Sequence, residues 1–359
     1  MITATKPFSP PLEEYQSKIA EIFSNNWFTN HGPMVTELEQ KLKDYFDVPY
    51  LVIVSNGTIA LQIAIKALDL RDEVITTPFS YVATTSSIFW ENCTPRFADI
   101  NPITLNIEPS AIRNLISDRT SGIIATNVYG YPCDFESINK LSKEFNIPVI
   151  YDNAHGFSSK YKGKDLLNQG NISTISFHAT KLFHSVEGGA IVCQDEKTYK
   201  KLLSLRNFGH TSPYTFDGVG INGKMNELCG AMGLVNLNHL DEILAKRKKQ
   251  WNYYFKELSN TSLDTMSYNY DEVEFNHAYF PVIFDKEVKL IETMAALERK
   301  NVFTRRYFSP SLNMLGYLTI KDSCPISEDI SSRIICLPLY HDLSIEDQDL
   351  ILNTIKKTC

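Results

Sequence analysis

The sequence predicts an α/β protein with a mainly parallel, doubly wound sheet, followed by a smaller C-terminal α/β domain. Three observations favour this fold class. Short apolar runs alternate with amphipathic stretches from about residue 50 to residue 195, and strands separated by single helices form sheets covered on both faces. The 359 residues exceed the usual size of one compact core. Beyond Cys193, a polar loop and longer helical patterns replace the alternation.

The expected strands of the first domain are short apolar runs. They cover residues 51–54, 73–77, 96–99, 123–129, 149–151, 172–177 and 190–193. The helices expected between and after them have apolar residues at helical spacing. They cover residues 59–68, 80–90, 135–145 and 195–207. Asp134 directly precedes the third of these helices and is placed to cap it.

The remaining chain predicts a second, smaller unit. Residues 209–223 are expected to form a polar loop, and residues 225–258 one or two long helices. The elements expected after them are two strands that alternate with two helices. They cover residues 278–284, 288–300, 334–338 and 345–356. We therefore divide the chain into an N-terminal arm with a large domain, 1–240, and a small domain, 241–359. The first ~30 residues are expected to form a helix and an extended arm on the large domain.

Composition and charge exclude several classes of protein. The formal net charge of −7 argues against nucleic-acid binding, which normally requires a basic surface. No run approaches the roughly 18 consecutive apolar residues of a membrane helix, and the N-terminal residues lack the apolar core of a signal peptide. The seven cysteines form no CxxC pair, which disfavours a disulfide framework or a metal site. We expect a cytoplasmic protein with no metal, membrane or nucleic-acid partner.

Residues 55–58, Ser-Asn-Gly-Thr, lie where a strand passes into a helix. The unpaired N–H groups and the dipole of a helix start favour an anion such as phosphate. Gly57 would let the backbone approach that anion, and Thr58 would add a hydroxyl. A plain capped helix start is the simpler interpretation of this segment taken alone.

Asp152 follows the apolar run Pro-Val-Ile-Tyr and so stands at the carboxyl end of a strand. Open α/β sheets place their ligands at this edge. A carboxylate at this edge could hold a protonated pyridine nitrogen, which would keep a pyridine cofactor electron-withdrawing. His155 could orient the carboxylate or flank the ring, although a histidine that is only structural is a common alternative.

Lys181 follows the strand expected over residues 172–177 and precedes a Glu-Gly-Gly turn at 187–189. A desolvated lysine amine is a nucleophile that can form a Schiff base with a carbonyl. A lone loop lysine is usually solvated, but here Asp152, the helix start at Gly57 and the hydroxyls of Ser176 and Thr180 accompany it. The set favours pyridoxal 5′-phosphate (PLP) and an aminotransferase. Tyr81, which follows another strand, is the candidate to stack on the ring.

These segments, in this order, resemble the DegT/DnrJ/StrS family of nucleotide-sugar aminotransferases, which are fold type I PLP enzymes. The resemblance runs nearly end to end. The segments that carry it are Trp-Phe-Thr-Asn-His-Gly-Pro-Met-Val at 27–35, residues 55–58, Thr-Pro-Phe-Ser-Tyr-Val-Ala-Thr at 77–84, Asp-Asn-Ala-His at 152–155, residues 176–181 with 187–189, Asn-Gly-Lys-Met-Asn-Glu at 222–227, and Leu-Pro-Leu at 337–339. The lysine segment with its Gly-Gly turn is the most specific of them.

The resemblance implies roles for single residues. Gly57, Thr58 and Ser176 would hold the cofactor phosphate, Tyr81 and His155 would contact the ring, Asp152 would pair with its nitrogen, and Lys181 would bond covalently to its aldehyde. Asn222 would reach the phosphate bound by the neighbouring subunit, so that a homodimer shares its active sites. A related branch carries histidine in place of the lysine and catalyses a dehydration. Lys181 disfavours that branch.

The sugar is expected to contact the arm at Phe28 and Thr29, the loop at His184, and the run that contains Arg306 and Tyr307. Arg305 and Arg306 together could meet a diphosphate, or they could form ordinary surface ion pairs. His184 resembles the subgroup that aminates C4 of dTDP-linked keto-sugars, with L-glutamate as amino donor, for O-antigen or another surface glycan. Two alternatives stay open: a PLP-dependent lyase or aldolase on the same fold, and a non-catalytic regulator.

Overall fold

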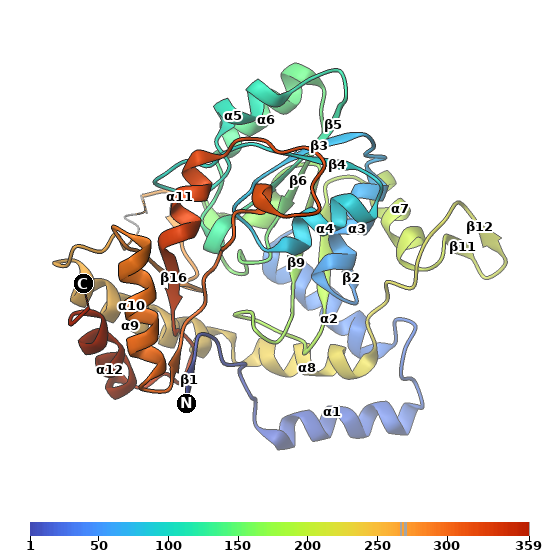
Figure 1. The fold of residues 1–359 in the computed structure, drawn as a ribbon. Coiled ribbons are helices and arrows are strands. Elements are labelled where there is room, and N and C mark those ends of the chain that lie inside the picture. Colours follow the sequence, from blue (N-terminus) through green and yellow to red (C-terminus); the bar gives the residue numbers. More distant parts are fainter. Residues whose placement is uncertain (266–267, 269–270, 359) are drawn as a thin grey trace.

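The structure is a computed structural model that describes residues 1–265, 268 and 271–358 (Figure 1). Seven strands form its central sheet. They are β2 (Tyr50–Val54), β3 (Glu73–Thr76), β4 (Thr94–Phe97), β5 (Thr120–Thr126), β6 (Val149–Asp152), β9 (Ile172–Ser176) and β10 (Gly189–Cys193). Their order in the sheet is β2-β10-β9-β6-β5-β3-β4. All neighbours are parallel except β10, which runs antiparallel to both β2 and β9, so the expected mainly parallel sheet is confirmed.

Helices cover both faces of this sheet. Along β2, Val52 and Val54 pack into one apolar core, whereas Leu51 and Ile53 pack into another on the opposite face. One face carries α3 (Gly57–Ala67), α4 (Val82–Trp90) and α7 (Glu196–Arg206). The other face carries α2 (Pro33–Phe46), α5 (Pro109–Leu115) and α6 (Phe135–Phe145). Burial on two faces explains why the strands read as continuous apolar runs.

The helix expected over residues 135–145 is confirmed with those bounds, and Asp134 caps it by accepting a hydrogen bond from Ser137 N at 3.0 Å. The strand expected over 123–129 is wrong at its end, because β5 stops at Thr126. Asn127 Oδ1 accepts a hydrogen bond from Cys133 N at 2.7 Å, which folds the chain back. The turn η1 (Val128–Gly130) holds Tyr129 at a φ of 55°. The apolar composition of this run does not reveal the turn.

Three helices were not expected from the sequence, and each begins with proline. They are α2, α5 and α11 (Pro325–Arg333). Proline favours the first turn of a helix because its missing N–H needs no partner there and its φ is already helical. In α2, the buried residues Val35, Leu38 and Leu42 follow helical spacing behind that proline. Sequence signals for this helix were therefore present.

The C-terminal part pairs β14 (Phe280–Ile283) with β16 (Ile334–Leu337) in an antiparallel sheet. Both strands were expected from the sequence, but their pairing was not. The segment 225–258 forms two helices, α8 (Glu227–Asn238) and α9 (Leu240–Leu258), which His239 separates. Two further helices, α10 (Glu287–Glu298) and α12 (Ile345–Ile355), complete this part. The domain boundary at residue 240 stays a prediction.

The N-terminal arm packs only partly as expected. Helix α1 (Leu12–Asn25) lies along α8, but β1 (Ile2–Thr3) pairs in parallel with β15 (Val302–Phe303) of the C-terminal part (Figure 1). The short strand pairs with an edge that would otherwise be open.

The segment expected to be a polar loop contains a hairpin, β11 (His210–Ser212) and β12 (Thr215–Phe216), which projects from the molecule (Figure 1). The other short elements are β7 (Lys160–Tyr161), β8 (Lys164–Asp165), β13 (Val273–Glu274), η2 (Leu166–Asn168) and η3 (Leu312–Met314). Within the part of the chain that is described, none of the helices combines the length and apolar character that crossing a membrane requires.

Candidate active site

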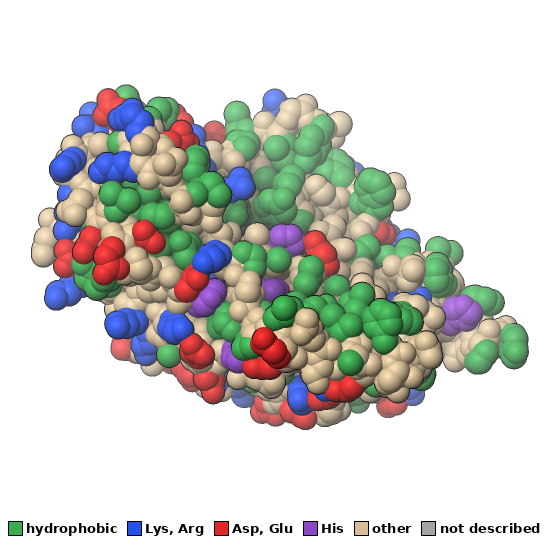
Figure 2. Space-filling view, turned by 90° about the horizontal axis from the view of Figure 1, so that it is seen from below, with side chains coloured by type: hydrophobic (Ala, Val, Ile, Leu, Met, Phe, Trp, Pro, Cys, Tyr) green, Lys and Arg blue, Asp and Glu red, His purple; other side chains and the backbone are tan. Residues whose placement is uncertain are grey.

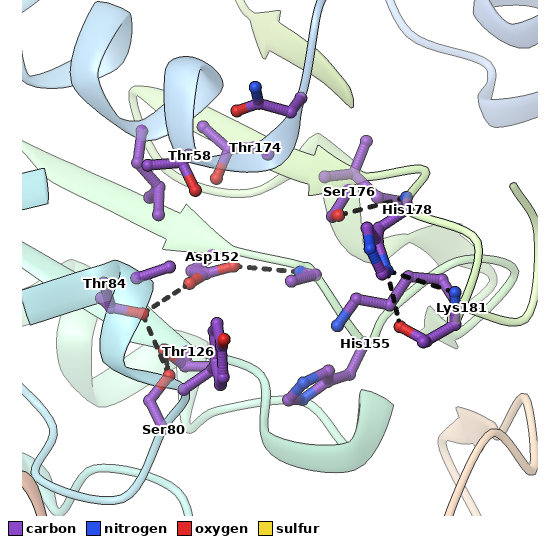
Figure 3. A pocket seen from close by; sticks show the side chains of 18 of the residues that line it. Thr58, Ser80, Thr84, Thr126, Asp152, His155, Thr174, Ser176, His178 and Lys181 are labelled. Carbon is purple, nitrogen blue, oxygen red and sulfur yellow. Dashed lines mark hydrogen bonds between the residues drawn. The ribbon is translucent and has the colours of Figure 1, made fainter. Parts of the chain in front are cut away.

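A cavity of about 580 Å³ opens at the carboxyl ends of β6 and β9, beside the first turns of α3 and α4 (Figure 3). Arg305, Tyr307 and Phe308 of the C-terminal part also line it. Its size suits a small-molecule ligand. Most of the site residues predicted from the sequence line this cavity. They are Gly57, Thr58, Tyr81, Asp152, His155, Ser176, Lys181 and Tyr307.

The start of α3 forms one end of the cavity. Asn56 caps this helix by accepting a hydrogen bond from Ile59 N at 2.8 Å. A Cβ atom at Gly57 would lie 2.7 Å from Ser176 Cβ, so only glycine fits against β9 here. Thr58 and Ser176 both line this end of the cavity (Figure 3). A helix N-terminus with two hydroxyls can hold a phosphate.

Asp152 ends β6 and is 4% exposed. Its carboxylate accepts hydrogen bonds from Thr84 Oγ1 at 2.9 Å and from Ala154 N at 3.0 Å. Burial raises the pKa of Asp152, and the two hydrogen bonds together with the positive charge of Lys181 oppose that rise. A buried carboxylate of this kind is suited to pair with a cation in the cavity.

Lys181 lies in the turn after β9, where its backbone N–H donates to His178 O at 2.8 Å. Its amine points into the cavity, toward the side where Asp152 and His155 lie (Figure 3). Burial lowers the pKa of Lys181, and the negative charge of Asp152 opposes that change. A lowered pKa makes the neutral, nucleophilic amine more accessible at neutral pH.

His155 is held as a neutral imidazole. Burial, with a smaller effect from Lys181, lowers the pKa of His155 well below its ordinary value. Its Nδ1 accepts a hydrogen bond from Tyr129 N at 3.2 Å. Phe308 stacks on the imidazole with a centroid distance of 5.4 Å and an interplanar angle of 13°. The Tyr129 hydroxyl donates to Tyr307 O, which joins this cluster to the C-terminal part.

The remaining predicted site residues do not line the cavity of their own chain. Phe28 and Thr29 are exposed on the arm after α1, where the Phe28 ring packs against Phe23 at 5.1 Å. Asn222 is exposed at the base of the hairpin.

His184 is 4% exposed and lies within 2.8 Å of Phe8 O, while its own carbonyl accepts a hydrogen bond from Asn236. Its position after the lysine turn suggested substrate contact, but the turn directs it toward α8 and the arm. Arg306 Nη2 donates to Ser331 O at 3.0 Å and to Ser332 O, so Arg306 points away from the cavity.

Arg305, the partner in the predicted arginine pair, lines the cavity where Arg306 does not. Alternation along an extended segment places neighbouring side chains on opposite sides, so one of the two had to point away. Thr84, Ser80 and Thr126 also line it and were not singled out, because single hydroxyl residues carry no recognisable spacing.

Comparison with known proteins identifies the family. The model of the DegT/DnrJ/EryC1/StrS aminotransferase family matches residues 12–356. The chain belongs to this family. It is 37% identical to a dTDP-4-amino-4,6-dideoxy-D-glucose transaminase of Shigella dysenteriae, over 99% of this chain and 98% of the relative. It is 35% identical to the protein of that name in Escherichia coli, over 96% and 95%.

Solved structures agree with the family assignment. A crystal structure of DesI in the presence of its TDP-sugar product is 26% identical, covers 99% of this chain and 92% of its own, and superposes with a TM-score of 0.94. The chain is thus a PLP-dependent sugar aminotransferase of fold type I, and the expected fold, enzyme class and cofactor are confirmed. The cavity fits this cofactor, because it combines an anion-binding helix start, a buried carboxylate and a desolvated lysine.

Proposed function

We propose that this aminotransferase converts dTDP-4-dehydro-6-deoxy-D-glucose into the 4-amino-4,6-dideoxy sugar, with L-glutamate as amino donor. The two dTDP-sugar transaminases to which the chain is 35% and 37% identical support this substrate. The observation that carries the proposal is the placement of Lys181 opposite Asp152 in one cavity (Figure 3). An amine and a carboxylate so placed match two groups of PLP. The amine can bond to the aldehyde, and the carboxylate can pair with the ring nitrogen.

Different residues of the cavity would bind different parts of the cofactor. We propose that Gly57, Thr58 and Ser176 bind its phosphate at the start of α3, and that Asp152 holds the protonated ring nitrogen. Tyr81, which is 59% exposed and directly precedes α4, would cover one face of the ring. His155 would flank the cofactor ring as a neutral group. The stacked contact between Phe308 and the His155 imidazole is in keeping with this.

Lys181 is the proposed catalytic residue. When bound, PLP withdraws electrons from the α-carbon of the amino donor. Lys181 Nζ would hold the cofactor aldehyde until the donor amine displaces it, and would then take the proton from the donor α-carbon as a general base. The same amine would act as a proton donor when the keto-sugar is aminated. Its desolvated position supports both tasks, because burial favours the neutral amine.

We further propose a homodimer with shared active sites. Asn222 would reach the partner's phosphate, since it does not line the cavity of its own chain. Exposed apolar side chains on the hairpin support a protein contact there: Tyr214 is 94% and Phe216 61% exposed. Further exposed apolar side chains lie on α1 and directly after it, and Figure 2 shows apolar side chains gathered there: Leu12, Phe23, Trp27 and Phe28. Exposed apolar surface of this extent is typical of an interface.

The sugar nucleotide would bind between the subunits. Phe28 and Thr29 of one arm would then face the partner's cavity, and Tyr307 would line the sugar site. Arg305 supplies the cation at the cavity for a diphosphate or a donor carboxylate. His184 and Arg306 would act indirectly. His184 would fix the turn that contains Lys181, and Arg306 would fix the segment 305–308. We propose that the enzyme works in the cytoplasm and contributes to the synthesis of O-antigen or another surface polysaccharide. The described cysteines form no disulfide, which is in keeping with a reducing compartment.

A substrate panel tests this function. The purified enzyme would be incubated with L-glutamate and a set of dTDP- and UDP-linked keto-sugars, and 2-oxoglutarate and the amino sugar would be measured. We expect turnover with dTDP-4-dehydro-6-deoxy-D-glucose and none without a keto-sugar. Turnover with a 3-keto sugar or a UDP-sugar alone would contradict the proposed substrate. Breakdown of an amino acid without any acceptor would instead favour the lyase.

A further inference from the structure

Three buried hydroxyls form a chain behind the carboxylate of Asp152 (Figure 3). Thr126 Oγ1 donates to Ser80 Oγ at 3.2 Å, and Ser80 Oγ lies 3.0 Å from Thr84 Oγ1. Thr84 Oγ1 then donates to Asp152 Oδ2 at 2.9 Å. The three side chains are at most 2% exposed. They come from three separate elements: the end of β5, the segment after β3 and the first turn of α4.

The charge of Asp152 fixes the direction of this chain. An ionised carboxylate only accepts hydrogen bonds, so the Thr84 hydroxyl must point its proton at Asp152. The Thr84 oxygen is then free to accept from Ser80, and Ser80 accepts from Thr126. All three protons therefore point toward the carboxylate. Hydrogen bonds aligned in this way polarise one another inside a protein, where the dielectric is low.

We propose that Ser80, Thr84 and Thr126 form a positioning relay that orients Asp152 and keeps it ionised, and thereby holds the proton on the ring nitrogen of bound PLP. This inference rests on the role of Asp152 in the proposed function. Without the relay, the carboxylate would be left with Ala154 N as its protein donor in a site where desolvation works against charge. The three hydroxyls do not react; they act through Asp152.

Thr85 provides a matched contrast in the same helix. It is fully buried, and its Oγ1 has no hydrogen-bond partner among the described residues. It does not belong to the lining of the cavity. Replacement of Thr85 by valine removes a buried hydroxyl next to Thr84 without touching the relay. Any effect on the packing of α4 alone would appear in both valine variants.

The test measures cofactor binding and ring protonation in the full-length chain. PLP affinity would be determined by titration of the apo form, and protonation of an isotopically labelled ring nitrogen by NMR as the pH is raised. We expect Thr84→Val to bind PLP about ten- to hundredfold more weakly, as for a lost hydrogen bond to a charged group. At the same pH the ring nitrogen should be less protonated than in the wild type, because a carboxylate that has lost a donor is more basic and draws the shared proton toward Asp152. Thr84→Ser should restore both properties, and Thr85→Val should leave them unchanged.

The outcomes separate the relay from the function on which it rests. Unchanged affinity and unchanged ring protonation in Thr84→Val would overturn the relay, as would equal losses in Thr84→Val and Thr85→Val. If Thr84→Val does not fold, Ser80→Ala decides: a smaller shift in the same direction supports the relay, and wild-type behaviour refutes it. Asp152→Asn provides the separation. If that variant also behaves as the wild type, the proposed role of Asp152 fails, and the relay fails with it.

Discussion

Two buried aspartates show how surroundings assign a role to one residue type. Asp152 has two hydrogen-bond donors and faces the amine of Lys181 across the cavity. Asp165, on β8, is 5% exposed and accepts one hydrogen bond from Leu167 N at 2.9 Å. Burial raises the pKa of Asp165 to about 7, although the hydrogen bond from Leu167 N and the charge of Lys160 oppose the rise. We propose a functional role for the charge on Asp152, whereas the charged form of Asp165 destabilises the fold.

Asp165→Asn should stabilise the protein at alkaline pH. The folded state keeps the proton of Asp165 up to about pH 7, whereas the unfolded chain releases it near 3.8. Stability from this residue is thus lost as the pH rises through that window, and the full penalty applies above it. We expect the variant to gain about 2 to 4 kcal/mol of unfolding free energy at pH 8 and almost nothing at pH 4.

Urea denaturation at the two pH values measures this difference. Asp134→Asn, which changes an exposed helix cap of the same kind, is the matched control and should show no such gain. An equal effect of Asp165→Asn at pH 4 and pH 8 would show that titration of this carboxyl is not the cause.

At the scale of elements, the sequence allowed the sheet to be predicted because each strand is buried on two faces and so is a continuous apolar run. Helix α6, which Asp134 caps, was predicted with the correct bounds. Helices that open with proline were missed, although proline in the first turn is itself a signal. The antiparallel direction of β10 was not predicted, since apolar composition does not encode strand direction.

The lining of the cavity was predictable where a residue stands at or just after the end of a strand or the start of a helix, as Gly57, Asp152 and Lys181 do. Contacts between distant segments were not predictable. Glu227 illustrates this: its carboxylate accepts hydrogen bonds from Met34 N at 2.7 Å and Val35 N at 3.2 Å and so caps α2. The motif that contains Glu227 was recognised, but only the fold shows which helix it caps.

At the scale of the whole molecule, several predicted contacts are incomplete in one chain. Asn222, Phe28 and Thr29 lie on exposed segments and do not line the cavity of their own chain. The hairpin beside Asn222 projects with its aromatic side chains exposed (Figures 1 and 2). A two-fold dimer would bring each of these segments to the other subunit.

Mixed dimers test this arrangement. A Lys181→Ala subunit lacks the catalytic amine, and an Asn222→Ala subunit lacks the side chain proposed to serve its partner. Each variant alone should be impaired. After unfolding and refolding together, one site of each mixed dimer would be complete, so activity should recover to about a quarter of the wild-type value. No recovery above the sum of the separate variants would indicate that Asn222 acts within its own subunit.

The central claim is that Lys181 holds the cofactor aldehyde. The most direct measurement is reduction of the PLP-loaded protein with borohydride, followed by proteolysis and mass spectrometry. We predict that the added pyridoxyl mass lies on the peptide that contains Lys181 and is absent from Lys181→Arg. Recovery of that peptide without the added mass, or with the label on another lysine, would contradict the account.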